Sequence, residues 1–72
     1  MTKAFAKGAK VRWNWATGSG EGKVVERFER RVSRTLKGKR ITRVGTAENP
    51  AYLLRQEDGD QVLKRGSELE KA

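Results

Sequence analysis

The sequence contains no cysteine and no histidine. Disulfide bonds are therefore excluded, and the ligands that structural zinc sites use most often are missing. The same absences remove the common thiol nucleophile and imidazole base, so metal-dependent and triad-type hydrolases are set aside. A chain of 72 residues also has little room for both a core and a deep catalytic cleft. We expect a protein that is not an enzyme and uses no cofactor and no metal.

Long apolar runs are missing as well. The longest runs of aliphatic residues larger than alanine are pairs, such as Val24-Val25 and Leu53-Leu54, whereas a membrane-spanning helix needs about 20 apolar residues. The first nine residues lack the apolar segment of a signal peptide. These features predict a cytoplasmic protein with no membrane partner.

Basic residues are abundant and unevenly distributed. There are 17 lysines and arginines against nine acidic residues, for a net charge of +8. Nearly all of this excess lies between residues 30 and 43, where no acidic residue occurs. The basic residues of this segment are Arg30, Arg31, Arg34, Lys37, Lys39, Arg40 and Arg43. Such a local charge favours polyanionic partners, DNA or RNA above all, although a solvated hairpin that only keeps the protein soluble would carry the same charge.

Alternation of apolar and polar residues predicts strands in the first half of the chain. Val11, Trp13 and Trp15 alternate with polar residues, as expected for a strand with one buried face. The glycines of residues 17–22 predict a loop. A long second strand is expected over residues 23–32, because β-branched valines and flanking glycines favour it over the alternative, a helix.

The second half of the chain is expected to contain three more short strands. Residues 33–39 end in Lys-Gly-Lys and are predicted to turn the chain back into a third strand over residues 40–44, antiparallel to the second. A fourth strand is predicted over residues 51–55. The Asp58-Gly59 pair then predicts a hairpin turn into a fifth strand over residues 61–64.

Five short strands with glycine-rich turns predict an all-β fold, a small five-stranded antiparallel SH3-like barrel. We expect one domain over residues 1–72, with the barrel at about 8–70, short flexible termini and a monomeric state. Ser67 is expected to cap a last short turn.

Several blocks of the sequence resemble a known family. They are Phe5-Ala-Lys-Gly8, Val11-Arg-Trp13-Asn-Trp15, Gly20-Glu-Gly22-Lys-Val24, Ile41-Thr-Arg43, Asn49-Pro50-Ala51-Tyr52-Leu53, Val62-Leu63-Lys64 and Ser67-Glu68-Leu69. Over about residues 5–71 the chain is similar to the hypervirulence-associated protein Tudor-domain family. The resemblance implies a Tudor-like barrel. Tudor-like domains elsewhere bind methylated lysine or arginine in aromatic cages, or bind nucleic acid, so the fold alone does not choose the ligand.

The predicted site for nucleic acid combines the seven basic residues of positions 30–43 with Trp15. Basic side chains neutralise phosphates, and an exposed ring at the end of the first strand would stack on bases. No recognition helix is apparent, so we expect binding that is mostly independent of sequence.

The alternative is a protein-interaction domain. A pocket of aromatic rings would recognise a methylated or basic peptide through cation–π attraction. Its candidate residues are Trp13, Trp15, Phe28 and Tyr52. Against this hypothesis, Trp13 at the centre of its strand and Tyr52 at the start of another fit better as core residues. A sheet edge or the basic surface could also bind a protein partner.

Overall fold

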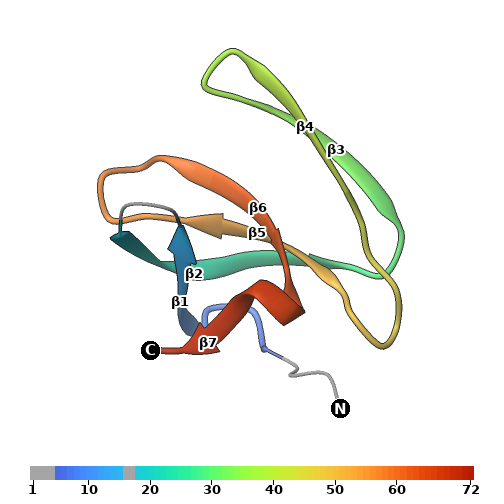
Figure 1. Ribbon diagram of the computed structural model, residues 1–72, viewed down its shortest axis with the longest axis horizontal. Helices are drawn as coiled ribbons and strands as arrows, with labels where there is room; N and C mark the ends of the chain where they lie inside the picture. Colours follow the sequence, from blue (N-terminus) through green and yellow to red (C-terminus); the bar gives the residue numbers. More distant parts are fainter. Residues whose placement is uncertain (1–4, 16–17) are drawn as a thin grey trace.

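The computed structural model describes residues 5–15 and 18–72. Within these residues the chain forms seven strands and one short 3₁₀ turn (Figure 1). The elements are β1 (Lys10–Trp15), β2 (Gly18–Phe28), β3 (Arg31–Leu36), β4 (Lys39–Val44), β5 (Ala51–Arg55), β6 (Gln61–Arg65), η1 (Gly66–Glu68) and β7 (Leu69–Lys71). No described segment forms a helix long and apolar enough to cross a membrane.

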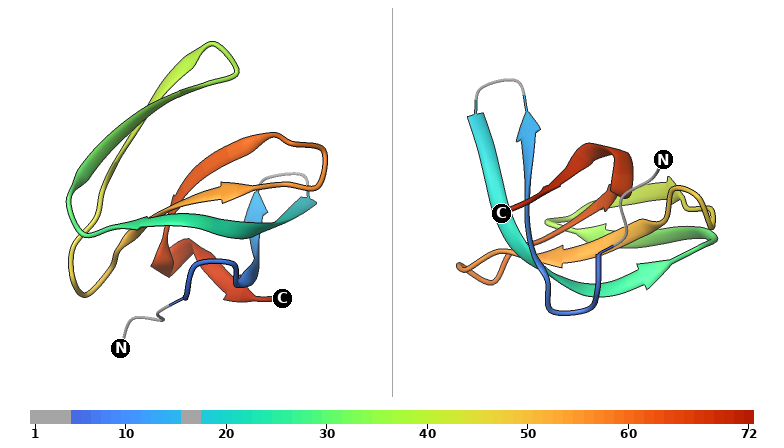
Figure 2. Two further views of the ribbon diagram at one scale, coloured as in Figure 1. Left: turned by 180° about the vertical axis from the view of Figure 1, so that it is seen from behind. Right: turned by 90° about the horizontal axis from the view of Figure 1, so that it is seen from below.

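The strands form two antiparallel sheets. The larger has the order β6-β5-β2-β1-β7, and the smaller is the β3–β4 hairpin. Strand β2 is long enough to pair with β1 along its first half and with β5 along its second, with a register shift between Val24 and Glu26. Such an irregularity bends and twists a strand. The β3–β4 hairpin projects beyond the sheet and packs against β6 (Figures 1 and 2).

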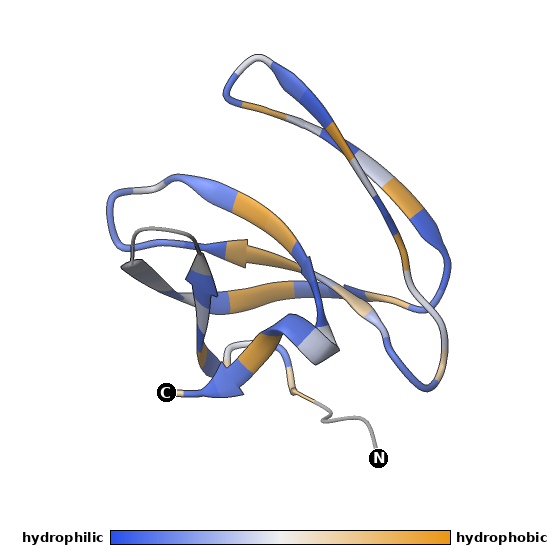
Figure 3. Cartoon of the chain, in the orientation of Figure 1, coloured by the Kyte–Doolittle hydropathy of each residue, from blue (hydrophilic) through white to orange (hydrophobic). Residues whose placement is uncertain are grey.

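Strand β5 connects the two halves of the core. Its first four residues are all buried, and because side chains alternate along a strand they enter two different clusters. One cluster contains Phe5, Val11, Trp13, Val24, Tyr52, Leu54 and Leu69. The other contains Phe28, Val32, Ala51, Leu53 and Leu63, with Val25, Leu36 and Ile41 packed against it. Apolar segments therefore occur on β2, β5, β6 and the hairpin (Figure 3).

Side-chain hydrogen bonds anchor the connections around β5. The amide of Asn49 donates to the hydroxyl of Ser67 at 3.2 Å and accepts from the Ser67 backbone N–H at 2.9 Å. The backbone N–H of Gly66 donates to the carbonyl of Pro50 at 2.8 Å. Tyr52 is fully buried, and its hydroxyl accepts a bond of 3.1 Å from the backbone N–H of Phe5. These contacts hold the β4–β5 connection against η1 and the N-terminal segment against the sheet.

The prediction of an all-β, antiparallel fold is confirmed. The prediction of a loop over residues 17–22 is wrong for residues 18–22, the part of it that the structure describes. Residues 18–22 belong to β2 and pair with β1. The indole of Trp13 occupies the space where a side chain at Gly20 would lie, since a Cβ there would be 2.8 Å from the ring. The glycines therefore make room for a ring and do not interrupt the strand.

Two further predictions need correction. The predicted second strand ends at Phe28, and residues 31–36, interpreted as strand end and turn, form β3. Strand β4 therefore pairs with β3, not with the second strand. The turn between them is only Lys37-Gly38, whose φ values of 52° and 76° are those of a type I′ hairpin.

The predicted cap at Ser67 is also wrong. At the start of η1 the Glu68 carboxylate accepts a hydrogen bond of 3.2 Å from the backbone N–H of Arg65. Ser67 lies inside the turn and bonds to Asn49 instead.

Candidate functional site

The β3–β4 hairpin divides the predicted basic segment between two faces. Residues that pair directly across antiparallel strands share a face. Val32, Leu36 and Ile41 pack on the core, so their face, here called the inner face, looks toward the sheet. It also carries Arg34, Lys39 and Arg43. The opposite outer face carries Arg31, Ser33, Thr35, Arg40, Thr42 and Val44.

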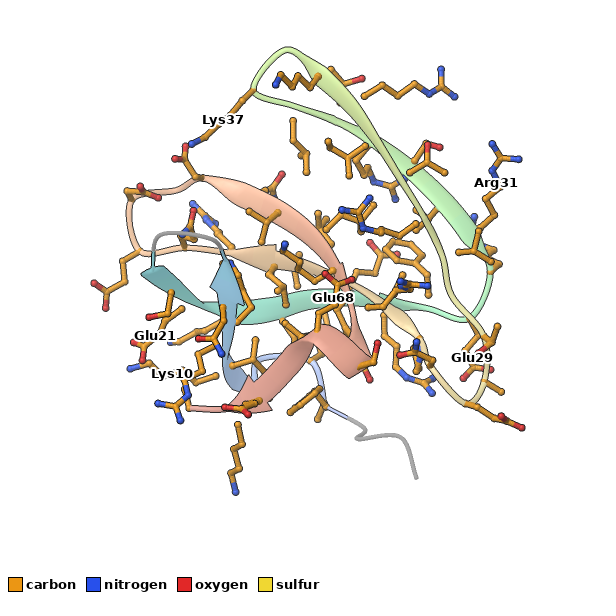
Figure 4. The ribbon with its side chains drawn as sticks, in the orientation of Figure 1. Lys10, Glu21, Glu29, Arg31, Lys37 and Glu68 are labelled. Atoms are coloured by element: carbon orange, nitrogen blue, oxygen red, sulfur yellow. The ribbon has the colours of Figure 1, made fainter. Side chains whose placement is uncertain are left out.

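Apart from the exposed Val44, the outer face is polar and basic. Arg31 and Arg40 are exposed, and among the described residues neither takes part in an ion pair. The side chain of Arg31 points away from the ribbon (Figure 4). The hydroxyls of Ser33 and Thr42 share a hydrogen bond of 2.8 Å between the strands. The outer face therefore offers two free cations and several hydroxyl groups, with no carboxylate.

The inner face forms one wall of a groove whose other wall is β6. The groove has a volume of about 340 Å³. Its apolar lining consists of Leu36, Ile41, Val62 and Leu63. Its charged lining consists of Lys37, Lys39, Arg43 and Lys64. No acidic residue lines it within the described chain, so the groove combines an aliphatic floor with a cationic rim.

An ion pair connects the tip of the hairpin with the β5–β6 turn. The Lys37 ammonium lies 2.8 Å from a carboxylate oxygen of Asp60, and Figure 4 shows the Lys37 side chain reaching toward that turn. The hydrogen bond to Asp60, together with its charge, raises the pKa of Lys37 above the ordinary lysine value. Lys37 therefore stays protonated while Asp60 compensates part of its charge. Glu68 likewise compensates Lys64, whose ammonium lies 3.7 Å from a Glu68 carboxylate oxygen.

Two of the predicted arginines pack on an aromatic ring. The guanidinium of Arg30 lies 5.3 Å, and that of Arg34 lies 5.0 Å, from the centre of the Phe28 ring. Both distances are within the range of cation–π attraction. Phe28 itself is only 4% exposed. These arginines therefore help to cover the core.

The residues of the alternative aromatic pocket are not brought together on a surface. Trp13 and Tyr52 belong to one buried cluster and Phe28 belongs to the other. Their burial agrees with the interpretation of Trp13 and Tyr52 as core residues. Trp15 ends β1, but its side chain lies outside the described part of the structure. The described rings thus form no open cage.

The inner groove was not anticipated from the sequence. Its β6 wall contains Val62 and Lys64, which lie far along the chain from the basic segment. The alternation of apolar and basic residues in both strands was the available signal, but only the docking of the hairpin on β6 shows that they share a site. No group of three acidic, histidine or cysteine residues in the described chain is placed to hold a metal ion.

Comparison with known proteins identifies the chain by family alone. The sequence model of the family described as hypervirulence associated proteins TUDOR domain matches residues 8–69. No curated protein matches the sequence, and no solved structure matches it.

Proposed function

The chain belongs to the family of hypervirulence associated proteins TUDOR domain, and we propose that it binds nucleic acid through the outer face of the β3–β4 hairpin. Tudor-like domains are small binding modules, so the family supports a binding role. The choice of nucleic acid rests on the chemistry of the hairpin.

The observation that carries the proposal is the composition of the outer face. Arg31 and Arg40 are exposed there beside serine and threonine hydroxyls, without a carboxylate. Arginine, serine and threonine side chains are common donors to phosphate oxygens. These contacts position a protein on the nucleic-acid backbone without reading its sequence.

The shape of the hairpin supports the same ligand. Each strand has six residues and so extends about 20 Å. A two-stranded ribbon fits the major groove of B-DNA, which is about 12 Å wide. The ribbon also projects beyond the sheet (Figure 1), so a duplex could approach its outer face without meeting the barrel.

Salt dependence tests the electrostatic part of the proposal. The exposed cations of the outer face are Arg31 and Arg40. If both neutralise phosphates, the logarithm of the duplex-DNA association constant should fall against the logarithm of salt concentration with a slope of about −1.8. Fluorescence anisotropy of a labelled duplex between about 50 and 200 mM salt measures this slope.

A matched pair of double variants tests the location of the site. R31E/R40E reverses two charges on the outer face, and K39E/R43E reverses two charges on the inner face. Both variants change the net charge equally. We expect R31E/R40E to weaken binding at least about tenfold more than K39E/R43E and to remove most of the salt dependence of binding. Equal losses in the two variants, or no binding by the native protein at low salt, would overturn the proposal.

A further inference from the structure

The groove between the inner face of the hairpin and β6 has a different chemistry from the outer face. Its floor is aliphatic, with Leu36 and Ile41 from the hairpin and Val62 and Leu63 from β6. Its volume of about 340 Å³ falls in the range of ligand sites in proteins, about 300 to 1,000 Å³. The groove is therefore large enough to receive side chains of a partner.

The rim of the groove is basic, and only some of its positive charges are paired with carboxylates. Lys37 is paired with Asp60 and Lys64 lies near Glu68. Lys39 and Arg43 take part in none of the ion pairs of the described residues. These two cations stand beside the apolar floor without a carboxylate partner in the described chain, and the Arg43 guanidinium also donates a hydrogen bond of 2.9 Å to the Thr42 carbonyl.

The walls of the groove also have unpaired strand edges. Strand β6 is the last strand of the larger sheet, and β4 pairs with β3 alone. Although β4 lies beside β6, no backbone hydrogen bond joins the two strands in the described chain. A free edge presents N–H and C=O groups that an extended peptide can use.

We propose that this groove binds an extended acidic peptide with apolar residues at alternate positions. Alternate side chains of an extended peptide point to opposite faces, so apolar side chains can enter the groove while the carboxylates between them stay at its open side, within reach of the long side chains of Lys39 and Arg43 on the rim. The free edge of β6 supplies backbone partners. This function is separate from nucleic-acid binding, because it uses the opposite face of the hairpin.

The chemistry of the floor favours a peptide over single-stranded nucleic acid. Proteins that bind single strands commonly stack bases on aromatic side chains. No aromatic residue lines the groove within the described chain. An aliphatic floor instead matches leucine-like and isoleucine-like side chains, whose burial is favourable without a specific ring geometry.

Fluorescence anisotropy with a labelled Glu-Leu-Glu-Leu-Glu peptide and the full chain tests the proposal. We expect saturable binding at low salt, at least about tenfold tighter than binding of Lys-Leu-Lys-Leu-Lys or Glu-Ser-Glu-Ser-Glu. The lysine peptide tests the role of charge, and the serine peptide tests the role of the apolar floor. Equal binding of the serine peptide, or no saturable binding of the first peptide, would overturn the proposal.

The same double variants locate the peptide. K39E/R43E should weaken binding of Glu-Leu-Glu-Leu-Glu at least about tenfold more than R31E/R40E does, the reverse of the order expected for duplex DNA. A common order for both ligands would mean that peptide and DNA share one face and would overturn the separation of the sites. Failure of the peptide experiment alone leaves the DNA proposal standing, and the converse also holds.

Amide chemical shifts of the native protein supply a measurement that does not depend on the variants folding. Addition of the peptide should shift the amides of Val62 and Leu63 more than those of Arg31 and Thr42. Shifts confined to the outer face would overturn the proposal. Oligothymidylate added in parallel should leave the β6 amides unchanged, and if it shifts them in place of the peptide, the groove is a nucleic-acid site.

Discussion

Replacing Trp13 by alanine should lower the free energy of unfolding by about 3 to 5 kcal/mol. The indole is only 4% exposed and belongs to the cluster that β1, β2, β5 and β7 share. It also covers the backbone at Gly20 and Gly22. Alanine would therefore leave a cavity bordered by β1, β2, β5 and β7. Urea denaturation followed by far-ultraviolet circular dichroism measures the loss.

The size of this loss matters because the domain is small. A chain of 72 residues is expected to have a stability of only about 4 to 11 kcal/mol. Trp13→Ala should thus remove a large share of this stability, and a native protein near the lower end of the range would be largely unfolded by the substitution at 25 °C. Asn14→Ala is a suitable control, since Asn14 is exposed on the same strand and should change stability by less than about 0.5 kcal/mol. Equal midpoints for the two variants would contradict the core position of Trp13.

Replacing Gly45 by alanine should lower the free energy of unfolding by more than about 3 kcal/mol. This exceeds the usual loss when a larger side chain is introduced into a well-packed core. A Cβ at this position would lie 2.3 Å from the carbonyl oxygen of Phe28 and 2.6 Å from the backbone nitrogen of Ala51. Both obstructing atoms belong to the backbone, so no change of rotamer can relieve the contact. Either the ends of β2 and β5 or the β4–β5 connection would have to shift, and each of these segments borders the second core cluster.

The matched control for Gly45 is a glycine with free space around it. Gly38 lies in the β3–β4 turn with a φ of 76° and no atom within 4 Å of an added Cβ. Because asparagine tolerates positive φ in turns, Gly38→Asn should lower the free energy of unfolding by less than about 1 kcal/mol. Thermal melts of the two variants compare them directly. A melting temperature for Gly45→Ala near that of the native protein would show that the β4–β5 connection can move aside.

Local sequence patterns predicted the strands in which buried and exposed residues alternate regularly. Val11 and Trp13 identified β1, and the Asp58-Gly59 pair identified the β5–β6 turn, where Gly59 has a φ of 92°. The same reasoning failed at Gly20 and Gly22. Glycine ordinarily weakens a strand, but here the space above it is filled by the ring of Trp13. Sequence spacing does not show which distant residue fills such a space.

The basic character of the hairpin was predictable from the sequence, but the division of its residues between two faces was not. The basic segment was recognised from charge alone, and residues 33–36 were interpreted as part of a turn. Once β3 is known to extend through these residues, alternation places Arg31 and Arg34 on opposite sides. The inner face packs against β6. This is a contact between segments distant in the sequence, and no local pattern predicts it.

The pairing of β7 with β1 bears on the order of folding. This ladder joins Val11 to Lys71 and Trp13 to Leu69, so it closes a loop that contains most of the chain. The entropy cost of closing a loop rises with its length, and such distant contacts slow folding. The hairpins β3–β4 and β5–β6 can form early, whereas β7 must wait until the strands between have assembled. Its contacts should then act mainly on the rate of unfolding, as late-forming contacts do, and we expect the pairing of β7 with β1 to set the lifetime of the native fold.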